Sequence, residues 1–373
     1  MEPDDLDDWI QLTHQPGIGR AALRRLLAAF GSPRAVLNAT PAARRAAMGS
    51  RAAVDVLAAP DELALAQHVQ AVRAWLRTAP DRLVVTLGDA RYPPLLVQTA
   101  DPPLLLFMEG QIGALQRPAL AMVGSRSATP QGLANAFAFA RDMARQGWAI
   151  VSGLASGIDT AAHEGALAGG GPTIAVVGTG LSQIYPKANT ELTKRISQNG
   201  LVISEYPLDM PPLAANFPQR NRIIAGMTRG TLVVEAAVQS GSLITARQAA
   251  ESGRDVFAIP GSIHSPQARG CHVLLKQGAK LVETAQDVLE EMGSTVGQAE
   301  SSFESADDHR LPESLRETDV VLRALGHDPA TLDALMARCG WPAPELNAHL
   351  LELELAGQVA RLPGGLFQRM NVA

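Results

Sequence analysis

The sequence predicts an α/β protein whose main domain contains a parallel sheet, with a small helical domain before it and a small third domain after it. From about residue 83 to residue 292, short apolar runs of β type alternate with helical segments, which is typical of a parallel sheet covered by helices. Residues 5–80 are rich in Ala, Leu and Arg at helical spacing and contain no convincing strand. We therefore expect domains over residues 1–80, 81–292 and 313–373, with a polar linker over residues 293–312.

The composition excludes several classes of protein. A formal net charge of −5 argues against a protein that coats nucleic acid by overall positive charge, so a site for anions must be a local patch. The two cysteines, Cys271 and Cys339, form no CxxC motif or Cys/His cluster, so we expect neither a disulfide scaffold nor a metal site. Residues 1–5 are acidic where a signal peptide would be basic, and no apolar run approaches the ~20 residues of a membrane span. We expect a cytoplasmic protein without membrane contact.

The strands of the expected sheet place their carboxyl ends at one edge. The core strands are expected at Ala119–Val123, Ala149–Ser152, Thr173–Val177, Val202–Glu205, Leu232–Glu235 and Val256–Ile259, preceded by Leu83–Leu87 and Leu104–Met108. In open sheets of this kind, ligands bind in the crevice outside the carboxyl ends of the strands. The loops after these strands are therefore the place to look for binding or chemistry.

Small residues fill four of those loops. The loops are Gly124–Pro130, Ser152–Asp159, Gly178–Leu181 and Gln239–Thr245. Each loop taken alone could be a tight turn from strand to helix. Gly and Ser also leave backbone N–H groups open to phosphate oxygens, and helix starts such as Thr129-Pro130 point donors at an anion. Four such loops on one sheet edge favour a strip that binds anions.

The segment 216–222 adds one aromatic ring and two guanidinium groups. It lies in a region, residues 210–234, that contains no Asp or Glu. Phe217 offers a base a face for stacking, while Arg220 and Arg222 offer phosphate planar, permanently charged donors. The alternative is a helix that begins at Pro218, with Phe217 packed in the core and solvated arginines. Together with the loops, this segment favours a groove for single-stranded nucleic acid.

Signals for an enzyme are weak. No GxxxxGK[ST] motif occurs, and no GxGxxG follows the first core strand, so we expect no nucleotide cofactor. Asp159 and His163 are four residues apart on one helix face, which is more often a capping and packing arrangement than an acid/base pair. Glu205 and Glu235 end strands, and we expect them to hold the arginines in place. No residue is assigned a catalytic role.

The flanking regions carry weaker signals. Pro16–Gly19 before an amphipathic segment resembles the turn of a helix-hairpin-helix unit, which presents N–H groups to phosphate, but a single such turn favours a simple Gly-capped helix pair. After three helical patterns, at residues 319–325, 331–338 and 344–356, two short strands around Pro363–Gly365 fit a winged helix. Its third helix contains Glu345, Glu352 and Glu354 but no Lys or Arg, which favours contact with protein over DNA.

A series of motifs runs in order along the main domain and resembles one family. The motifs are Val123–Arg126, Ser152–Asp159, Ala162–His163, Gly178–Gly180, Ile184–Pro186, Phe217–Gly226, Val234–Ala236, Ser240–Ser242 and Ala258–Gly261. They resemble the DNA-processing protein A family, also called DprA or Smf. His272 departs from the Asn that we associate with many members, which affects only the hydrogen bonds of its loop.

The resemblance implies both a fold and a function. It implies an extended Rossmann-like sheet that dimerises, binds single-stranded DNA and helps to load the RecA recombinase during natural transformation, beside an N-terminal domain similar to SAM or helix-hairpin-helix units. With the residue patterns, it assigns the DNA site to Gly124, Ser125, Arg126, Ser156, Gly157, Lys187, Asn216, Phe217, Arg220, Asn221, Arg222, Ser240, Gly241 and Ser242.

Two alternatives stay open. A Rossmann-type nucleotide-processing enzyme, similar to a phosphoribohydrolase, would use Glu235 in catalysis, but the Gln239–Thr245 loop lacks the Pro-Gly-Gly and the Glu that such enzymes carry. A regulator that acts on DNA through the winged helix is the other alternative.

Overall fold

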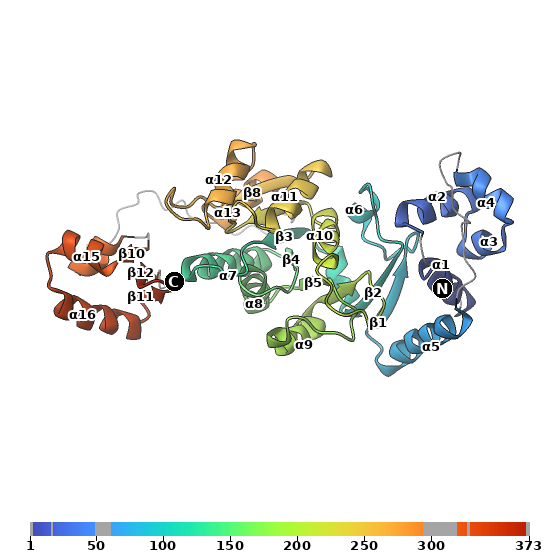
Figure 1. The fold of residues 1–373 in the computed structure, drawn as a ribbon, viewed down its shortest axis with the longest axis horizontal. Coiled ribbons are helices and arrows are strands. Elements are labelled where there is room, and N and C mark those ends of the chain that lie inside the picture. Colours follow the sequence, from blue (N-terminus) through green and yellow to red (C-terminus); the bar gives the residue numbers. More distant parts are fainter. Residues whose placement is uncertain (1–2, 16–17, 49–60, 294–318, 327–328, 371–373) are drawn as a thin grey trace, which may run out of the picture.

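The main domain is built on a nine-stranded sheet that runs through the middle of the molecule (Figure 1). The computed structural model describes residues 3–15, 18–48, 61–293, 319–326 and 329–370. The strands are β1 (Arg82–Thr86), β2 (Leu105–Gly110), β3 (Ala119–Val123), β4 (Ala149–Ser152), β5 (Thr173–Val177), β6 (Leu201–Ser204), β7 (Gly230–Val233), β8 (Asp255–Ala258) and β9 (Lys280–Leu281). Their spatial order is β1-β2-β6-β5-β4-β3-β7-β8-β9.

The sheet confirms the predicted fold class and extends it. From β6 to β9 all neighbouring strands pair in parallel, while β1 and β2 form an antiparallel extension at one edge. The eight predicted strands are present with small shifts at their ends, and β9 is an additional short edge strand. The sequence could not reveal the antiparallel edge, because short apolar runs look alike in both pairings.

Helices cover both faces of the sheet. They are α6 (Pro94–Val97), α7 (Pro130–Arg145), α8 (Ile158–Ala168), α9 (Thr190–Asn199), α10 (Asn216–Gly226), α11 (Ser242–Glu251), α12 (Arg269–Lys276) and α13 (Ala285–Met292), with the 3₁₀ turns η1 (Ile112–Gln116) and η2 (Lys187–Asn189). Along β3, Ala121 and Val123 pack on the side of α10 to α12, and Leu120 and Met122 pack on the side of α7, α8 and α13. This alternation follows from the two-residue period of a strand and makes β3 a fully buried central strand.

The N-terminal helices pack against the antiparallel edge. They are α1 (Pro3–Thr13), α2 (Arg20–Phe30), α3 (Pro33–Asn38), α4 (Pro41–Met48) and α5 (Glu62–Thr78). Trp75 of α5 meets Phe107 of β2 edge to face at 6.0 Å, so this domain shares a hydrophobic core with the sheet. Of the predicted hairpin turn, Pro16 and Gly17 lie outside the described residues, and Gly19 precedes α2 in extended conformation.

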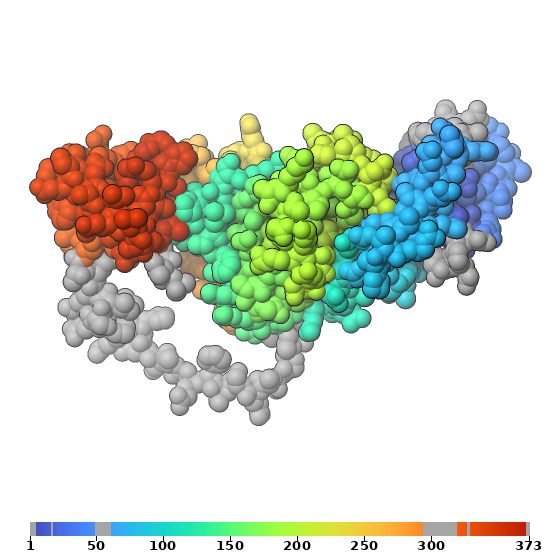
Figure 2. Space-filling model, turned by 90° about the horizontal axis from the view of Figure 1, so that it is seen from below, coloured from blue at the N-terminus to red at the C-terminus, as the bar shows by residue number. Residues whose placement is uncertain are grey.

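The C-terminal region forms the winged helix that the sequence predicts. It comprises α14 (Val320–Leu325), β10 (Ala330–Thr331), α15 (Leu332–Cys339), α16 (Ala343–Leu355), β11 (Val359–Leu362) and β12 (Leu366–Arg369), with the strand order β10-β12-β11. It lies at one end of the elongated molecule and the N-terminal helices at the other (Figures 1 and 2). Residues 294–312 of the expected linker lie outside the described residues.

Candidate functional site

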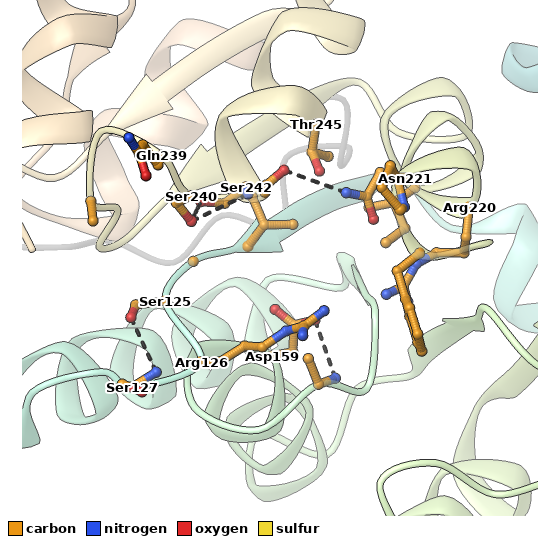
Figure 3. A pocket seen from close by; sticks show the side chains of 18 of the residues that line it. Ser125, Arg126, Ser127, Asp159, Arg220, Asn221, Gln239, Ser240, Ser242 and Thr245 are labelled. Carbon is orange, nitrogen blue, oxygen red and sulfur yellow. Dashed lines mark hydrogen bonds between the residues drawn. The ribbon is translucent and has the colours of Figure 1, made fainter. Parts of the chain in front are cut away.

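A large pocket opens at the point of the sheet where the order of the strands reverses. β3 lies between β4 and β7, and the chain continues from β3 to β4 on one side and from β7 to β8 on the other. Such a switch point leaves a crevice outside the carboxyl ends of the two strands. Here the crevice is a cavity of about 770 Å³ between the loops after β3, β4 and β7 and the start of α10 (Figure 3).

The structure brings nine of the predicted site residues into this pocket. They are Gly124, Ser125, Arg126, Phe217, Arg220, Asn221, Ser240, Gly241 and Ser242. They come from two separate loops, after β3 and after β7, and from α10, and Figure 3 shows the labelled side chains on opposite walls. The loops meet because parallel strands end at the same edge, as the sequence pattern indicates.

Arg126 and two aromatic rings form one wall. The Arg126 guanidinium lies 5.6 Å from the centre of the Phe217 ring, and the Phe217 and Tyr185 rings are 5.6 Å apart at 45°. Arg126 and Tyr185 are exposed. In the described part of the chain no carboxylate pairs with Arg126, so its charge is available to an anion. A planar cation beside the half-buried Phe217 ring and the exposed Tyr185 ring suits a base and its phosphate together.

Arg220 lies beneath the pocket and holds two loops together. It is 3% exposed, and its Nη1 donates to the carbonyl oxygen of Gly153 at 2.6 Å and to that of Val176. A Cβ on Gly153 would lie 2.3 Å from Nη1, so only glycine allows this approach. Burial lowers the pKa of Arg220 to about 10, opposed by Asp159, so the group stays charged at neutral pH. Arg220 therefore supplies positive charge from below while its donors bind carbonyls.

Asp159 and His163 make separate structural contacts. The Asp159 carboxylate accepts hydrogen bonds from Gly153 N at 3.1 Å and Ala155 N at 3.3 Å. Burial raises the pKa of Asp159, while Arg220 and these amides oppose the shift. No hydrogen bond between Asp159 and His163 is present among the described residues, and His163 Nδ1 lies 2.7 Å from the Thr173 hydroxyl. Asp159 therefore stabilises the loop after β4, and His163 is a packed core residue.

The start of α11 faces the pocket, and its first N–H groups are bonded locally. The Ser242 N–H donates to Ser240 Oγ at 3.4 Å, and the Leu243 and Ile244 N–H groups donate to the carbonyl oxygens of Ser240 and Gly241 at 3.1 Å. The preceding Gly241 is exposed. Ser240 and Ser242 share a hydrogen bond of 2.7 Å between their hydroxyls, and Asn221 Nδ2 approaches Gly241 O at 3.5 Å (Figure 3). The positive end of a helix dipole still attracts anions. The pocket thus combines this helix start with the Arg126 guanidinium.

Arg222 does not line the pocket, in contrast to the prediction. Its Nε lies 2.9 Å from Asp101 Oδ2, and its Nη2 pairs with Glu205 Oε1. In α10, Phe217, Arg220 and Asn221 are three and four residues apart and share one face, whereas Arg222 is rotated by about 200° from Arg220. The sequence shows that the arginines are present, but it does not show on which side of the helix each one lies.

The two strand-end glutamates differ from each other. Glu205 pairs with Arg222, which agrees with the expectation that it holds an arginine. Glu235 instead accepts hydrogen bonds from the Thr129 N–H at 2.9 Å and from the Thr129 hydroxyl at the start of α7. Burial raises the pKa of Glu235, and the Thr129 donors oppose the shift. Glu235 therefore braces a helix start.

The remaining predicted residues lie around the pocket. Ser156 lines a smaller cavity of about 60 Å³ beside Arg126, and Lys187 is exposed next to that cavity at Pro186. Asn216 is buried and donates to Gly178 O at 3.2 Å, and Gly157 packs between loops. Tyr185 lines both cavities and was not among the predicted residues, because nothing in the sequence indicates that its loop reaches α10.

His272, which departs from the family pattern, makes an ordinary loop contact. Its Nε2 lies 2.9 Å from Gly261 O. The described residues contain no cluster of three or more His, Cys, Asp or Glu side chains suited to a metal ion. Within the same residues, no helix has the length and apolar character to cross a membrane.

Comparison with known families now decides the relationship. Residues 83–293 match the family model of DNA recombination-mediator protein A, and residues 305–365 match the DprA winged helix domain. The chain belongs to the DNA recombination-mediator protein A (DprA/Smf) family. The resemblance drawn from the motifs is thereby confirmed, as is the Rossmann-like core with a C-terminal winged helix.

Several relatives of this DprA/Smf family member are close in sequence or structure. It is 43% identical over 304 residues to Protein Smf of Escherichia coli (strain K12), and the match covers 80% of each chain. It is 52% identical over 203 residues to DNA processing protein DprA of Streptococcus pneumoniae (strain ATCC BAA-255 / R6), and this match covers 54% of this chain and 72% of the relative. The crystal structure of DprA from Streptococcus pneumoniae superposes with a TM-score of 0.63 at 40% identity, covering 75% of this chain and 95% of the other. DprA from Helicobacter pylori, whose structure is described for its single-stranded DNA binding mode, gives 0.51 at 31% identity, covering 56% and 95%.

Proposed function

We propose that this protein binds single-stranded DNA in the pocket at the switch point, and that it acts as a recombination mediator without chemistry of its own. One observation carries the proposal: the exposed Arg126 guanidinium lies 5.6 Å from the Phe217 ring, in the same pocket as the N-terminal end of α11. Phosphate and base therefore each find a matching group within one crevice.

The shape of the site favours an unpaired strand. The rings of Phe217 and Tyr185 can stack only on bases whose faces are free, and bases in a duplex are already stacked on each other. Each base stacked on an aromatic ring is worth about 1–3 kcal/mol. Because the chain carries a formal net charge of −5, binding depends on this local patch and not on overall charge.

Family membership supports a proposal for the finer role. We propose that the bound strand is passed to the RecA recombinase during natural transformation, in the cytoplasm, and that the protein works as a homodimer. Two apolar side chains, Ile263 in the loop after β8 and Leu281 in the edge strand β9, are 74% and 54% exposed and are candidates for a contact between copies. Sedimentation of the purified protein, alone and with RecA and a DNA strand, tests both partners.

The alternative enzyme would use Glu235 on a nucleotide. Both oxygens of Glu235 accept hydrogen bonds from Thr129, so this carboxylate braces a helix start, which disfavours the alternative.

A comparison of ligands tests the proposed function. Binding should be compared for oligothymidylate, a duplex of equal length and a panel of mononucleotides. We expect tight binding of the single strand, and tight binding confined to one mononucleotide would overturn the proposal.

The variant Arg126→Ala tests the site assignment. We expect weaker binding of oligothymidylate and a slope of log affinity against log salt that falls by about one, because one phosphate contact is lost. Arg195, exposed on α9 and outside the pocket, gives the matched control Arg195→Ala with an unchanged slope. Equal affinity and equal slope in Arg126→Ala and the wild type would refute the assignment.

A further inference from the structure

The two sides of helix α10 contact different parts of the molecule. Phe217, Arg220 and Asn221 face the pocket, whereas Gln219 and Arg222 face the N-terminal helices. The outer face joins a cluster of three arginines and two carboxylates, which we call the α2–α10 clamp and which consists of Arg20, Arg24, Asp101, Glu205 and Arg222. In Figure 1 the short α6 segment lies between α2 and α10, and Asp101 follows that segment.

The clamp joins the N-terminal domain to the helix through shared carboxylates. Asp101 Oδ2 lies 3.1 Å from Arg20 Nη2 and 2.9 Å from Arg222 Nε, and Asp101 Oδ1 pairs with Arg24. Glu205 pairs with Arg222 and lies 3.6 Å from Arg20 Nη1. Arg20 and Arg24 belong to α2, so each carboxylate bridges the two parts of the molecule.

Burial makes these contacts more than surface ion pairs. The side chains of Glu205 and Arg222 are 8% and 12% exposed, and that of Arg24 is 18% exposed. Burial alone would raise the pKa of Asp101, yet Arg222 and Arg20 outweigh it and the pKa is lowered. A partly desolvated network of this kind depends on all its members, because removal of one leaves the others poorly compensated.

The first turn of α10 needs such external support. No side chain caps this end of the helix, although Phe217 stands in that turn. Arg20 Nη1 donates to Gln219 Oε1 at 3.3 Å, which fixes the same turn from the side of α2. On the inner side, the Tyr206 hydroxyl donates to Asn216 O at 3.2 Å. The position of the Phe217 ring is thus set from both sides of the helix.

We propose that Arg20 and Arg24 are positioning residues for the DNA site: through Asp101, Glu205 and Arg222 they hold α10 so that Phe217 meets a base. The N-terminal helical domain thereby becomes part of the binding machinery without touching the strand. The inference rests on the proposed binding of single-stranded DNA, which is measured first on the wild-type protein.

The test combines a double-mutant cycle with a salt titration on the full chain. In Arg20→Ala/Arg24→Ala we expect affinity for oligothymidylate to fall about three- to tenfold, with an unchanged salt slope because no phosphate contact is lost. In a Phe217→Ala background the same double change should have a much smaller effect, since the ring that it positions is already absent.

An exposed arginine of α2 provides the control. Arg25→Ala removes an exposed arginine of the same helix and should change neither affinity nor slope. Affinity equal to that of the wild type, a slope that falls by about one, or a loss that is fully additive with Phe217→Ala would each overturn the proposal. If the double variant does not fold, Asp101→Asn is judged by the same three criteria. Failure of the wild type to bind the strand would instead refute the proposed function.

Discussion

His163 on α8 is a fully buried histidine whose surroundings fix its protonation. The Thr173 hydroxyl donates to Ile150 O at 2.8 Å, so its oxygen can accept the proton of His163 Nδ1 at 2.7 Å. The ring is therefore neutral, with the proton on Nδ1. Burial lowers the pKa of His163 to about 3, and the charge of Arg220 adds to the effect.

This histidine predicts acid sensitivity. The pKa of His163 is about 3 in the folded protein and about 6.5 in the unfolded chain. Between these values the unfolded chain binds a proton that the folded protein does not bind, so the free energy of unfolding falls as the pH drops below about 6.5. In His163→Gln, the difference in unfolding free energy between pH 7 and pH 5 should shrink by about 2 kcal/mol. Urea unfolding followed by circular dichroism at the two pH values measures it; an unchanged difference would contradict a neutral buried ring.

The arginines of α10 show what residue patterns can and cannot reveal. The absence of acidic residues from 210 to 234 drew attention to the segment, and Arg220 lines the pocket. Its donors, however, bind carbonyls of the sequence-distant Gly153 and Val176, and the partner Asp101 of Arg222 is more than a hundred residues away. Partners so far apart in the chain are set by tertiary packing, which local pattern does not encode.

At the scale of elements, the loops after β3 and β4 are interlocked. Gly157 precedes α8 with a φ of +80°, and a Cβ there would lie 2.3 Å from Ser125 O and 2.8 Å from Arg126 O. The sequence indicated small residues that approach a phosphate. In the structure this glycine instead allows one loop to approach the other, and so places Arg126.

The variant Gly157→Ala should damage both the loop and DNA binding. The left-handed backbone costs about 1–2 kcal/mol for a residue with a Cβ, and the contact with Ser125 O adds to it and displaces Arg126. Gly170→Ala is the matched control, because Gly170 has a φ of +75° but open space around its Cβ position. Thermal unfolding and binding of oligothymidylate should show a loss of affinity only for Gly157→Ala. Equal affinity in both variants would remove Gly157 from the site.

The order of elements was predictable to a large degree, and their pairing was less so. β3, β4 and β5 begin and end where the apolar runs do, because each is buried on both faces and reads as a continuous apolar stretch. β9 has only two residues, one of them exposed Leu281, and gives no such signal. The antiparallel edge formed by β1 and β2 depends on the N-terminal helices that cover it.

On the scale of the whole molecule, the winged helix stands apart from the main pocket. Pro329 and Gln368 line a second cavity of about 290 Å³ together with Thr129 and Glu235, whereas the pocket with Arg126 is lined by the main domain alone. The outer side of α16 exposes Leu351 and Leu355 at 56% and 82%, on a helix with three glutamates and no Lys or Arg. Acidic and apolar character suits a protein partner better than a DNA groove.

Removal of the C-terminal domain should therefore leave DNA binding in place. A variant that ends at Gly293 loses no residue of the main pocket, so its affinity for oligothymidylate should stay within about twofold of the wild type, as for changes distant from a site. Its salt slope should also be unchanged, because Arg126 and the start of α11 remain. Fluorescence anisotropy across a salt series measures both quantities. Loss of all DNA binding would contradict this prediction and favour the regulator that reads DNA through its winged helix, because the deleted domain would then contain the DNA site.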